Sequence, residues 1–307
     1  MKFKKILAVG LATLSLTALF GCAPKNENEL FMYDGTYSEE RLVNYMVKLL
    51  VEENTDLTVT IKEQMTSVNA FRELTAEKPS CDLLNAYDGT LLTTFLHLDP
   101  TDVPEGTSIY DYANSVAMER HKVRLLGKLG TDNTYAVAVP ETIAEKYKLK
   151  TVSDLIPVAG ELVFGAEHEF FSQEGSMKYG PFTEFYGLKF KNRVTVDLGL
   201  KYIGIENGNF DVTEVYATDG LNRKAKLKVL EDDKEFFPDY NGAILARDEI
   251  FEKYSKVAPN LEKTLNLIEG QISNEEMTDM TYAVDVEGKD VKDVAKDFLT
   301  NKGIIKA

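Results

Sequence analysis

Hydrophobic and polar positions follow two different periods along the chain, and together they predict a mixture of helices and strands. Between Arg41 and Val51 the apolar residues recur at helical spacing, whereas Leu57 to Ile61 alternates apolar and polar side chains as a half-buried strand does. The same patterns predict further strands over 134–139, 161–165, 193–196 and 210–216, and helices over 110–126, 141–147, 198–205, 247–255, 261–268, 274–282 and 291–300. This alternation predicts an α/β fold with largely parallel sheets.

The N-terminal segment has the pattern of an export signal. A short lysine-rich stretch precedes the uncharged apolar run from Ile6 to Phe20, which is short for a membrane span. Leu19-Phe20-Gly21-Cys22 resembles the lipobox of bacterial lipoproteins, which implies cleavage after residue 21 and lipidation of the Cys22 thiol. A plain secretory signal with an incidental cysteine is the alternative. Residues 22–29 are then the lipid anchor and a polar tether, and the body of the protein is expected outside the cytoplasm, held at the membrane.

Length and charge narrow the class of protein. A chain of 307 residues suggests one large domain or two lobes. The formal net charge is −15, and loss of the signal with its three lysines takes it to −18, which argues against nucleic acid as a partner. With two cysteines there is no disulfide framework, and Cys81 is expected to be a small buried residue.

No sequence motif points to catalysis. There is no Gly-rich nucleotide-binding motif, no Gly-x-Ser-x-Gly, and His168-Glu169 does not continue into a zinc motif because Ser172 stands at the second histidine position. The three histidines have no metal-ligand spacing. Adjacent carboxylates such as Glu39-Glu40 are expected to be solvated charges at a helix start. The sequence therefore predicts neither an enzyme nor a bound cofactor or metal.

Four tyrosines carry the functional hypothesis. The chain has 15 tyrosines and no tryptophan, and Tyr87, Tyr135, Tyr216 and Tyr240 stand in polar turns or at the ends of predicted strands. Each one alone is expected to be an ordinary half-buried aromatic. As a set they suit a quaternary ammonium ion, which has no N–H donor and binds to the faces of aromatic rings at ~0.5–2 kcal/mol per ring.

The segments around these tyrosines resemble the solute-binding lipoproteins of osmoprotectant ABC transporters, which bind glycine betaine, carnitine and choline. The resemblance implies a type II periplasmic-binding-protein fold: two α/β lobes, two crossing hinge strands and a ligand in the interlobe cleft. Lobe I is expected at 30–132 and 236–307, and lobe II at 133–235. The matching segments are Tyr87-Asp88-Gly89-Thr90, Asp132-Asn133-Thr134-Tyr135-Ala136, Tyr216-Ala217-Thr218-Asp219-Gly220, 232–240 and 272–277.

The resemblance also implies roles and partners. The family's tyrosine cage falls on Tyr87, Tyr135, Tyr216 and Tyr240, and Thr90 matches a polar residue beside the cage that influences specificity. The implied partners are a small quaternary ammonium ligand, the permease and ATPase subunits of an importer, and the membrane through the lipid at Cys22. The protein is expected to be a monomer whose lobes close over the ligand.

Two departures from the family pattern bear on the ligand. Relatives carry Gln or Lys ahead of a Thr/Ser-Glu pair, whereas Asp34-Gly35-Thr36-Tyr37 precedes Ser38-Glu39 here, and the arginine that binds the ligand carboxylate in some relatives is absent from 169–175. A betaine needs that carboxylate paired, which places choline slightly ahead. Against this, Thr90 matches the subgroup that binds several ligands, so the identity of the osmoprotectant stays open. The alternatives are another trimethylated or amino-acid-derived solute in the same fold, a non-transport surface lipoprotein, and an extracellular hydrolase.

Overall fold

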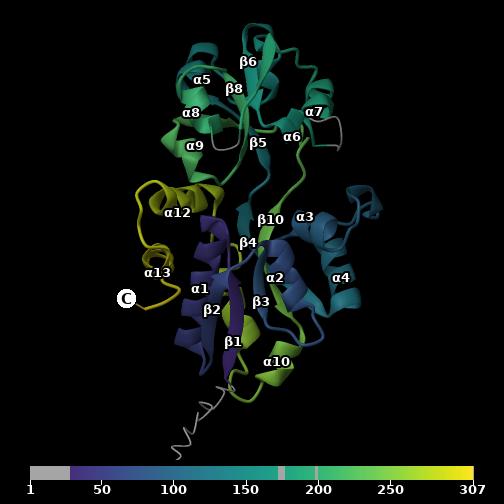
Figure 1. The fold of residues 1–307 in the computed structure, drawn as a ribbon, viewed down its shortest axis with the longest axis vertical. Coiled ribbons are helices and arrows are strands. Elements are labelled where there is room, and N and C mark those ends of the chain that lie inside the picture. The colour runs from purple at the N-terminus through teal and green to yellow at the C-terminus, as the bar shows by residue number, and fades with distance from the viewer. Residues whose placement is uncertain (1–27, 172–176, 198–199, 307) are drawn as a thin grey trace, which may run out of the picture.

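The computed structural model describes residues 28–171, 177–197 and 200–306, which form two lobes stacked along the long axis of the molecule (Figure 1). The lower one, lobe I, holds one sheet of two strands and one of three; the upper one, lobe II, holds a five-stranded sheet. The strands of lobe I are β1 (Glu29–Asp34), β2 (Thr58–Gln64), β3 (Leu83–Tyr87), β4 (Val123–Asp132) and β10 (Asn241–Arg247). Those of lobe II are β5 (Tyr135–Pro140), β6 (Val163–Ala166), β7 (Asn192–Thr195), β8 (Val212–Tyr216) and β9 (Leu227–Leu230).

Helices surround the sheets of both lobes (Figure 1). None of those in the described part of the chain is long and apolar enough to cross a membrane. Lobe I has α1 (Ser38–Asn54), α2 (Ser67–Leu74), α3 (Asp88–Thr90), α4 (Ile109–His121), α10 (Glu249–Lys253), α11 (Leu261–Leu265), α12 (Asn274–Asp285) and α13 (Val291–Asn301), with a π-helical turn over Leu91–Phe95. Lobe II has α5 (Glu141–Tyr147), α6 (His168–Phe171), α7 (Tyr179–Tyr186), α8 (Lys201–Glu206) and α9 (Gly220–Lys224).

The α/β prediction is confirmed, but the prediction of largely parallel sheets is wrong. β1 pairs in parallel with β2, and β6 pairs in parallel with β7 and β8. By contrast, β10 runs antiparallel to β3 and β4, and β5 runs antiparallel to β8 and β9. The reason is connectivity, since β5 and β10 enter their sheets directly from the other lobe rather than through a crossover helix.

The helix predicted over 110–126 is too long. α4 ends at His121 because Lys122 adopts a left-handed backbone conformation, with φ of +56°. From Val123 the chain is β4, in which Val123 and Leu125 are buried and pack with the strands of lobe I. Apolar residues spaced for a helix across this turn therefore belong to two elements.

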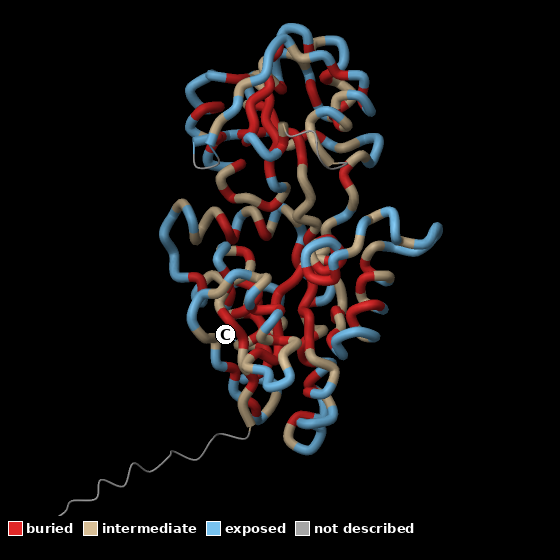
Figure 2. The backbone as a smooth tube through the Cα atoms, turned by 45° about the vertical axis from the view of Figure 1, so that its right-hand side comes forward, coloured by how far each residue is buried: buried red, intermediate tan, exposed pale blue. Residues whose placement is uncertain are grey.

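Each lobe has its own buried core, and the segments between the lobes are mostly only partly buried (Figure 2). The core of lobe I is mainly aliphatic around α1, which α13 and α12 cover. That of lobe II is rich in phenylalanine, with Phe164, Phe170, Phe182 and Phe237 in ring contact. Two independent cores let the lobes behave as separate bodies joined by a few strands.

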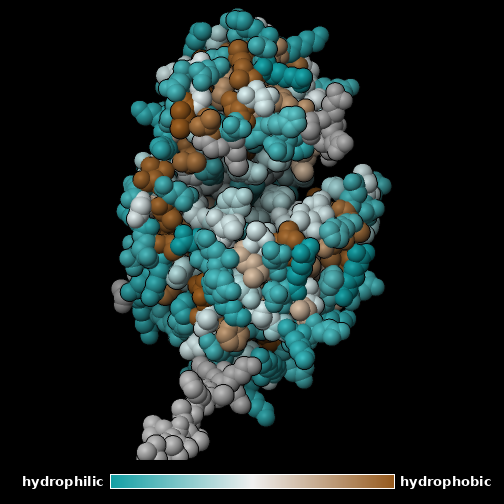
Figure 3. Space-filling view, viewed as in Figure 1, coloured by the Kyte–Doolittle hydropathy of each residue, from teal (hydrophilic) through white to brown (hydrophobic). Residues whose placement is uncertain are grey.

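Two chain segments run side by side between the lobes. The backbone N–H of Asn133 donates to the carbonyl of Tyr240 at 3.1 Å, and the Thr134 hydroxyl donates to the carbonyl of Pro238 at 2.8 Å. These segments join β4 to β5 and lead into β10, so they are the two crossing strands of a type II fold. Beside them the surface is notched between the lobes (Figure 3). The residue boundaries expected for the lobes stay predictions.

Candidate ligand-binding site

The four tyrosines singled out in the sequence form two stacked pairs. Tyr87 and Tyr240 have ring centroids 5.3 Å apart with 27° between the ring planes, and they make the lobe I pair. Tyr135 and Tyr216 have centroids 5.3 Å apart at 25°, and they make the lobe II pair. Burial chiefly raises the pKa of Tyr240, and the charge of an ionised Tyr135 would raise it further, so the two pairs lie within electrostatic range of each other.

Strand register produces both pairs. Tyr87 ends β3 and lies opposite Gly242 of β10, which places its ring beside Tyr240 at the entrance to that strand. Tyr135 begins β5 and lies directly opposite Tyr216, the last residue of antiparallel β8. Directly opposite aromatic residues on neighbouring strands stack naturally. Strand ends that face the crevice between two lobes are also where open α/β sheets bind ligands.

Neighbouring residues hold the rings of the lobe I pair in place. The Tyr87 hydroxyl donates to Glu39 Oε1 at 2.7 Å, and the hydroxyls of Thr90 and Tyr240 hydrogen-bond to each other. Gly89 is required for close packing, because a Cβ there would lie 2.3 Å from Cε2 of Tyr240. The ring of Tyr240 therefore rests directly on the backbone of the turn that carries Thr90.

Asp88 joins that turn to β10. Its side chain is 1% exposed and accepts hydrogen bonds from the backbone N–H of Gly89 at 2.8 Å, from the backbone N–H of Asn241 at 2.9 Å and from Asn241 Nδ2 at 2.8 Å. Three donors compensate for much of the cost of burying a carboxylate. Asp88 thus fixes the turn that carries Thr90 to the start of β10, next to Tyr240.

Glu39 is a site residue that the sequence analysis missed. The expectation of a solvated charge is wrong, since Glu39 is only 6% exposed in the first turn of α1. Its carboxyl accepts from Tyr87 and also from the hydroxyl of Thr218, which follows β8. Burial raises the pKa of Glu39. The Ser38-Glu39 pair in the family resemblance was the available signal, and Glu39 links the lobe I pair to a segment of lobe II.

The lobe II pair stands over a buried group of charges. Tyr216 is 41% exposed and Tyr135 is half-buried, and their hydroxyls hydrogen-bond to each other. Beneath them Lys201, 1% exposed, places Nζ 2.7 Å from Glu167 Oε1 and 3.2 Å from Glu214 Oε1. Nζ also lies 6.0 Å from the centroid of the Tyr216 ring. We call Glu167, Lys201 and Glu214 the buried triad.

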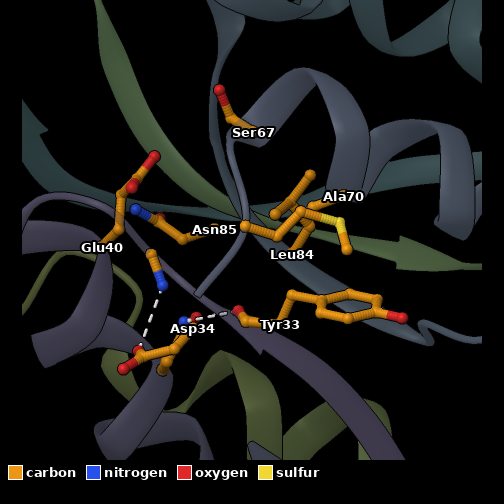
Figure 4. A pocket seen from close by; sticks show the side chains of 10 residues that line it. Tyr33, Asp34, Glu40, Ser67, Ala70, Leu84 and Asn85 are labelled. Atoms are coloured by element: carbon orange, nitrogen blue, oxygen red, sulfur yellow. Dashed lines mark hydrogen bonds between the residues drawn. The ribbon is translucent and has the colours of Figure 1, made fainter. Parts of the chain in front are cut away.

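Two cavities in lobe I lie near the lobe I pair. One lies at the end of β1 and beside the middle of β3, next to Glu40 and Asn85 (Figure 4). Its volume of about 10 Å³ suits a single water and excludes an organic cation. The other, of about 160 Å³, is lined by the residues flanking Tyr240 together with Asp88, Ser108, Ile109, Tyr110 and Lys128. Lys128 faces two carboxylates there, Asp88 and Asp239, so that cavity has no excess of positive charge.

The two lobes and the two strands that cross between them define the class of a two-lobed solute-binding protein. The family described as the substrate-binding domain of ABC-type glycine betaine transport systems matches residues 34–301. The chain belongs to this family of extracytoplasmic solute-binding proteins, which is not an enzyme family, and works as the substrate-binding protein of an ABC transport system.

Individual relatives agree with this assignment. The carnitine transport binding protein OpuCC of Listeria monocytogenes is 31% identical over 305 residues, which covers 97% of this chain and 94% of the relative. The ergothioneine transport permease/ergothioneine binding protein EgtU of Helicobacter pylori is 37% identical over 179 residues, 58% of this chain and 31% of the relative. The crystal structure of a glycine betaine/carnitine/choline ABC transporter protein superposes with a TM-score of 0.80 at 28% identity, covering 89% of this chain and 98% of that structure.

The predicted site residues thus fall into three groups. Tyr87, Thr90 and Tyr240 lie together in lobe I, and Tyr135 and Tyr216 lie together in lobe II. Cys22 lies outside the described residues, as does most of the stretch in which the arginine was sought, 172–175.

Proposed function

We propose that the protein captures a quaternary ammonium solute between the two tyrosine pairs and delivers it to a permease and ATPase. Lobe I at 30–132 and 236–307 closes on lobe II at 133–235 about the crossing strands. The 1–21 segment acts as the signal, and Cys22 anchors the protein by lipid outside the cell membrane. The body of the protein is a monomer and needs no cofactor.

The observation that carries the proposal is the pairing itself. Each lobe offers two stacked tyrosines at strand ends, and one tyrosine of each pair adjoins the segments that cross between the lobes. A cation held between two such pairs would meet several aromatic faces at ~0.5–2 kcal/mol each, with the larger value when water is excluded. Lobe closure supplies that exclusion and makes binding depend on both lobes at once. Four aromatic faces at the larger value sum to about 8 kcal/mol, which is the free energy of micromolar binding before the cost of association is subtracted.

Calorimetric titration of the purified protein with choline, carnitine and glycine betaine tests the proposal. At least one of the three is expected to bind, and Tyr135→Ala is expected to weaken that binding about tenfold because one aromatic face is lost. Tyr147→Ala is the matched control, since Tyr147 lies on α5 with its hydroxyl bonded to Glu161 at the surface. Absence of heat with these three solutes and with ergothioneine, from a protein that is folded by circular dichroism, overturns the proposal.

A second solute has a specific observation in its favour. Ergothioneine also carries a trimethylammonium group, and the relative named for binding it is 37% identical to this chain over the shared 179 residues. The same titration with ergothioneine separates the two readings. Binding of ergothioneine with no heat from choline, carnitine or glycine betaine would assign the tyrosine pairs to this trimethylated amino-acid derivative.

A further inference from the structure

The buried triad has an unusual charge balance for a place so little exposed. One ammonium, Lys201, faces two carboxyls, Glu167 and Glu214, and Lys201 and Glu214 are 1% and 2% exposed. If both carboxyls were ionised the group would carry a net charge of −1 inside the lobe, which is costly. The alternative is a single proton held between the carboxyls, which leaves the group neutral.

The geometry around Glu214 fits a shared proton. Glu214 Oε1 receives the ammonium of Lys201, whereas Glu214 Oε2 meets no hydrogen-bond donor in the described residues. The Glu167 carboxyl lies within hydrogen-bonding reach, so a proton on Glu214 gives that oxygen its partner. Burial, together with the neighbouring Glu167, raises the pKa of Glu214 to about 8 against the opposing effect of Lys201. Burial alone would raise the pKa of Glu167, but its hydrogen bonds with Glu214 and Lys201 outweigh this and leave it lowered.

The triad belongs to the ligand site by position. Glu167 directly follows β6, and Glu214 lies two residues before Tyr216 on β8, so both stand at the cleft edge of the sheet under the lobe II pair. The electrostatic influence of both carboxyls reaches Tyr135 and Tyr216. In the described residues, the triad's other titratable neighbours are Tyr202 on α8 and Asp219, which accepts from the Tyr202 hydroxyl at 2.6 Å.

The sign of the triad's net charge affects which ligands the site attracts. With the proton in place the triad is neutral, and without it the triad is negative; at neutral pH and above it is never positive. Lys201 cannot clamp a carboxylate, because its ammonium is buried and already held by two carboxyls. In lobe I, the cavity lined by the residues that flank Tyr240 holds Lys128 together with the carboxylates of Asp88 and Asp239. In the described residues, the lobe II side of the site is therefore electrostatically suited to a cation and offers no free partner for a carboxylate beneath the tyrosines.

We propose that the triad of Glu167, Lys201 and Glu214 makes the site select quaternary ammonium solutes that carry no carboxylate, and that ionisation of Glu214 strengthens the binding of such cations. The inference rests on the proposed function and names its substrate class, with choline as the probe and glycine betaine as the zwitterion for comparison. Glu167 and Glu214 act through the tyrosine pair above them, so they are specificity determinants rather than direct contacts.

Affinity measured against pH tests this inference. Choline keeps its charge between about pH 7 and about pH 9, so its affinity for the wild-type protein is expected to rise about fivefold over that range as Glu214 ionises. Glycine betaine, whose carboxylate opposes the gain, is expected to change less than about twofold. In Glu214→Gln the side chain keeps its size and stays neutral, so the rise with choline is expected to vanish.

Two further variants serve as a control for Glu214→Gln and as an alternative to it. Glu206→Gln is the matched control, because Glu206 is exposed on α8, the same helix as Lys201, and the wild-type pH profile is expected to persist. Should Glu214→Gln fail to fold, Glu167→Gln leaves Glu214 as the sole carboxyl partner of Lys201. Its ionisation then moves to lower pH, and the rise between about pH 7 and about pH 9 is again lost.

The outcomes separate the inference from the proposed function. Choline binding that exceeds betaine binding, with a pH rise that Glu214→Gln abolishes, supports both. Betaine binding equal to or tighter than choline binding, or a rise that survives in Glu214→Gln, overturns the inference and leaves the quaternary ammonium function standing. Binding of no quaternary ammonium solute at either pH overturns the function and the inference together.

Discussion

The two tyrosine pairs share nearly the same ring geometry but differ in what lies behind the rings. Both have centroids 5.3 Å apart. Behind the lobe I pair, hydrogen bonds and close packing dominate: Thr90 bonds Tyr240, Glu39 accepts from Tyr87, and Gly89 allows direct contact with the backbone. Behind the lobe II pair lies a buried ion cluster, and Tyr216 remains 41% exposed.

This difference suggests that the two lobes contribute to ligand binding in different ways. In the lobe I pair, hydrogen bonds hold the hydroxyls and close packing holds the rings. Such a preorganised surface loses little conformational entropy when a ligand binds. The lobe II pair is more exposed and lies above the buried triad. Its affinity for a ligand therefore depends on the charge of the triad and on the water that lobe closure removes. Changes in lobe I should therefore act through shape, and changes in lobe II through charge or through loss of a ring.

The largest effect is expected from adding one methyl group to lobe I. In Gly89→Ala the new Cβ would lie 2.3 Å from the Tyr240 ring, and Gly89 is helical, so the backbone tolerates alanine while the ring must move. Displacing Tyr240 breaks both the stack with Tyr87 and the bond to Thr90, and we expect affinity to fall about 100-fold by calorimetry.

The control for this change is Gly180→Ala in lobe II, where a Cβ meets nothing within 4 Å. It adds the same methyl group to a helix and should leave affinity unchanged. Unaltered ligand affinity in a folded Gly89→Ala protein would show that the position of Tyr240 is not critical, and the shape argument for lobe I would fail.

An intermediate effect is expected at Glu39, which links the lobes. Glu39→Ala leaves the buried hydroxyls of Tyr87 and Thr218 without their acceptor, and we expect about tenfold weaker binding. Glu39→Gln keeps the shape and can bond both hydroxyls, so its affinity should stay within about threefold of wild type. Equal losses in the two variants would show that the charge, and not the hydrogen bonds, positions Tyr87.

The same residue gives a stability test in the absence of ligand. Burial raises the pKa of Glu39 above its ordinary value of 4.5, so the ionised form is disfavoured in the folded protein. The stability that Glu39 contributes is present below about pH 4.5 and is lost as the pH rises through the raised pKa. The free energy of unfolding of Glu39→Gln relative to wild type should therefore increase with pH across that window, measured by urea denaturation.

Sequence patterns predicted the tyrosines of the candidate site better than they predicted the residues that support those tyrosines. Tyr135 and Tyr216 were visible because strand ends and turn residues mark the cleft edge, and the family resemblance grouped them with the lobe I pair. The sequence did not single out Lys201, because a lone lysine in a short helix is ordinarily a surface residue. Its burial depends on carboxyls 34 residues earlier and 13 residues later in the chain, a pairing that only the tertiary fold creates.

The errors in the fold have the same origin. Local periodicity could not place the end of the helix after residue 110, because Lys122 stops it through a left-handed conformation that lysine rarely adopts. Strand direction was also mistaken, since the antiparallel course of β5 and β10 follows from crossing between lobes. Glu39 was misjudged because a carboxylate in the first turn of a helix is usually solvated, and its burial depends on contact with Thr218 of the other lobe.

The smallest effect is expected from removing a single hydroxyl in lobe II. Tyr135→Phe keeps the ring and its stack with Tyr216 but loses the hydrogen bond between their hydroxyls. Because the cation contacts the ring face, and Phe and Tyr faces attract cations similarly, affinity for choline should fall less than about threefold, against about tenfold for Tyr135→Ala. Calorimetry on both variants measures the difference. A loss in Tyr135→Phe as large as in Tyr135→Ala would mean that the hydroxyl, rather than the aromatic face, holds the ligand, and lobe II would then resemble lobe I in acting through fixed hydrogen bonds.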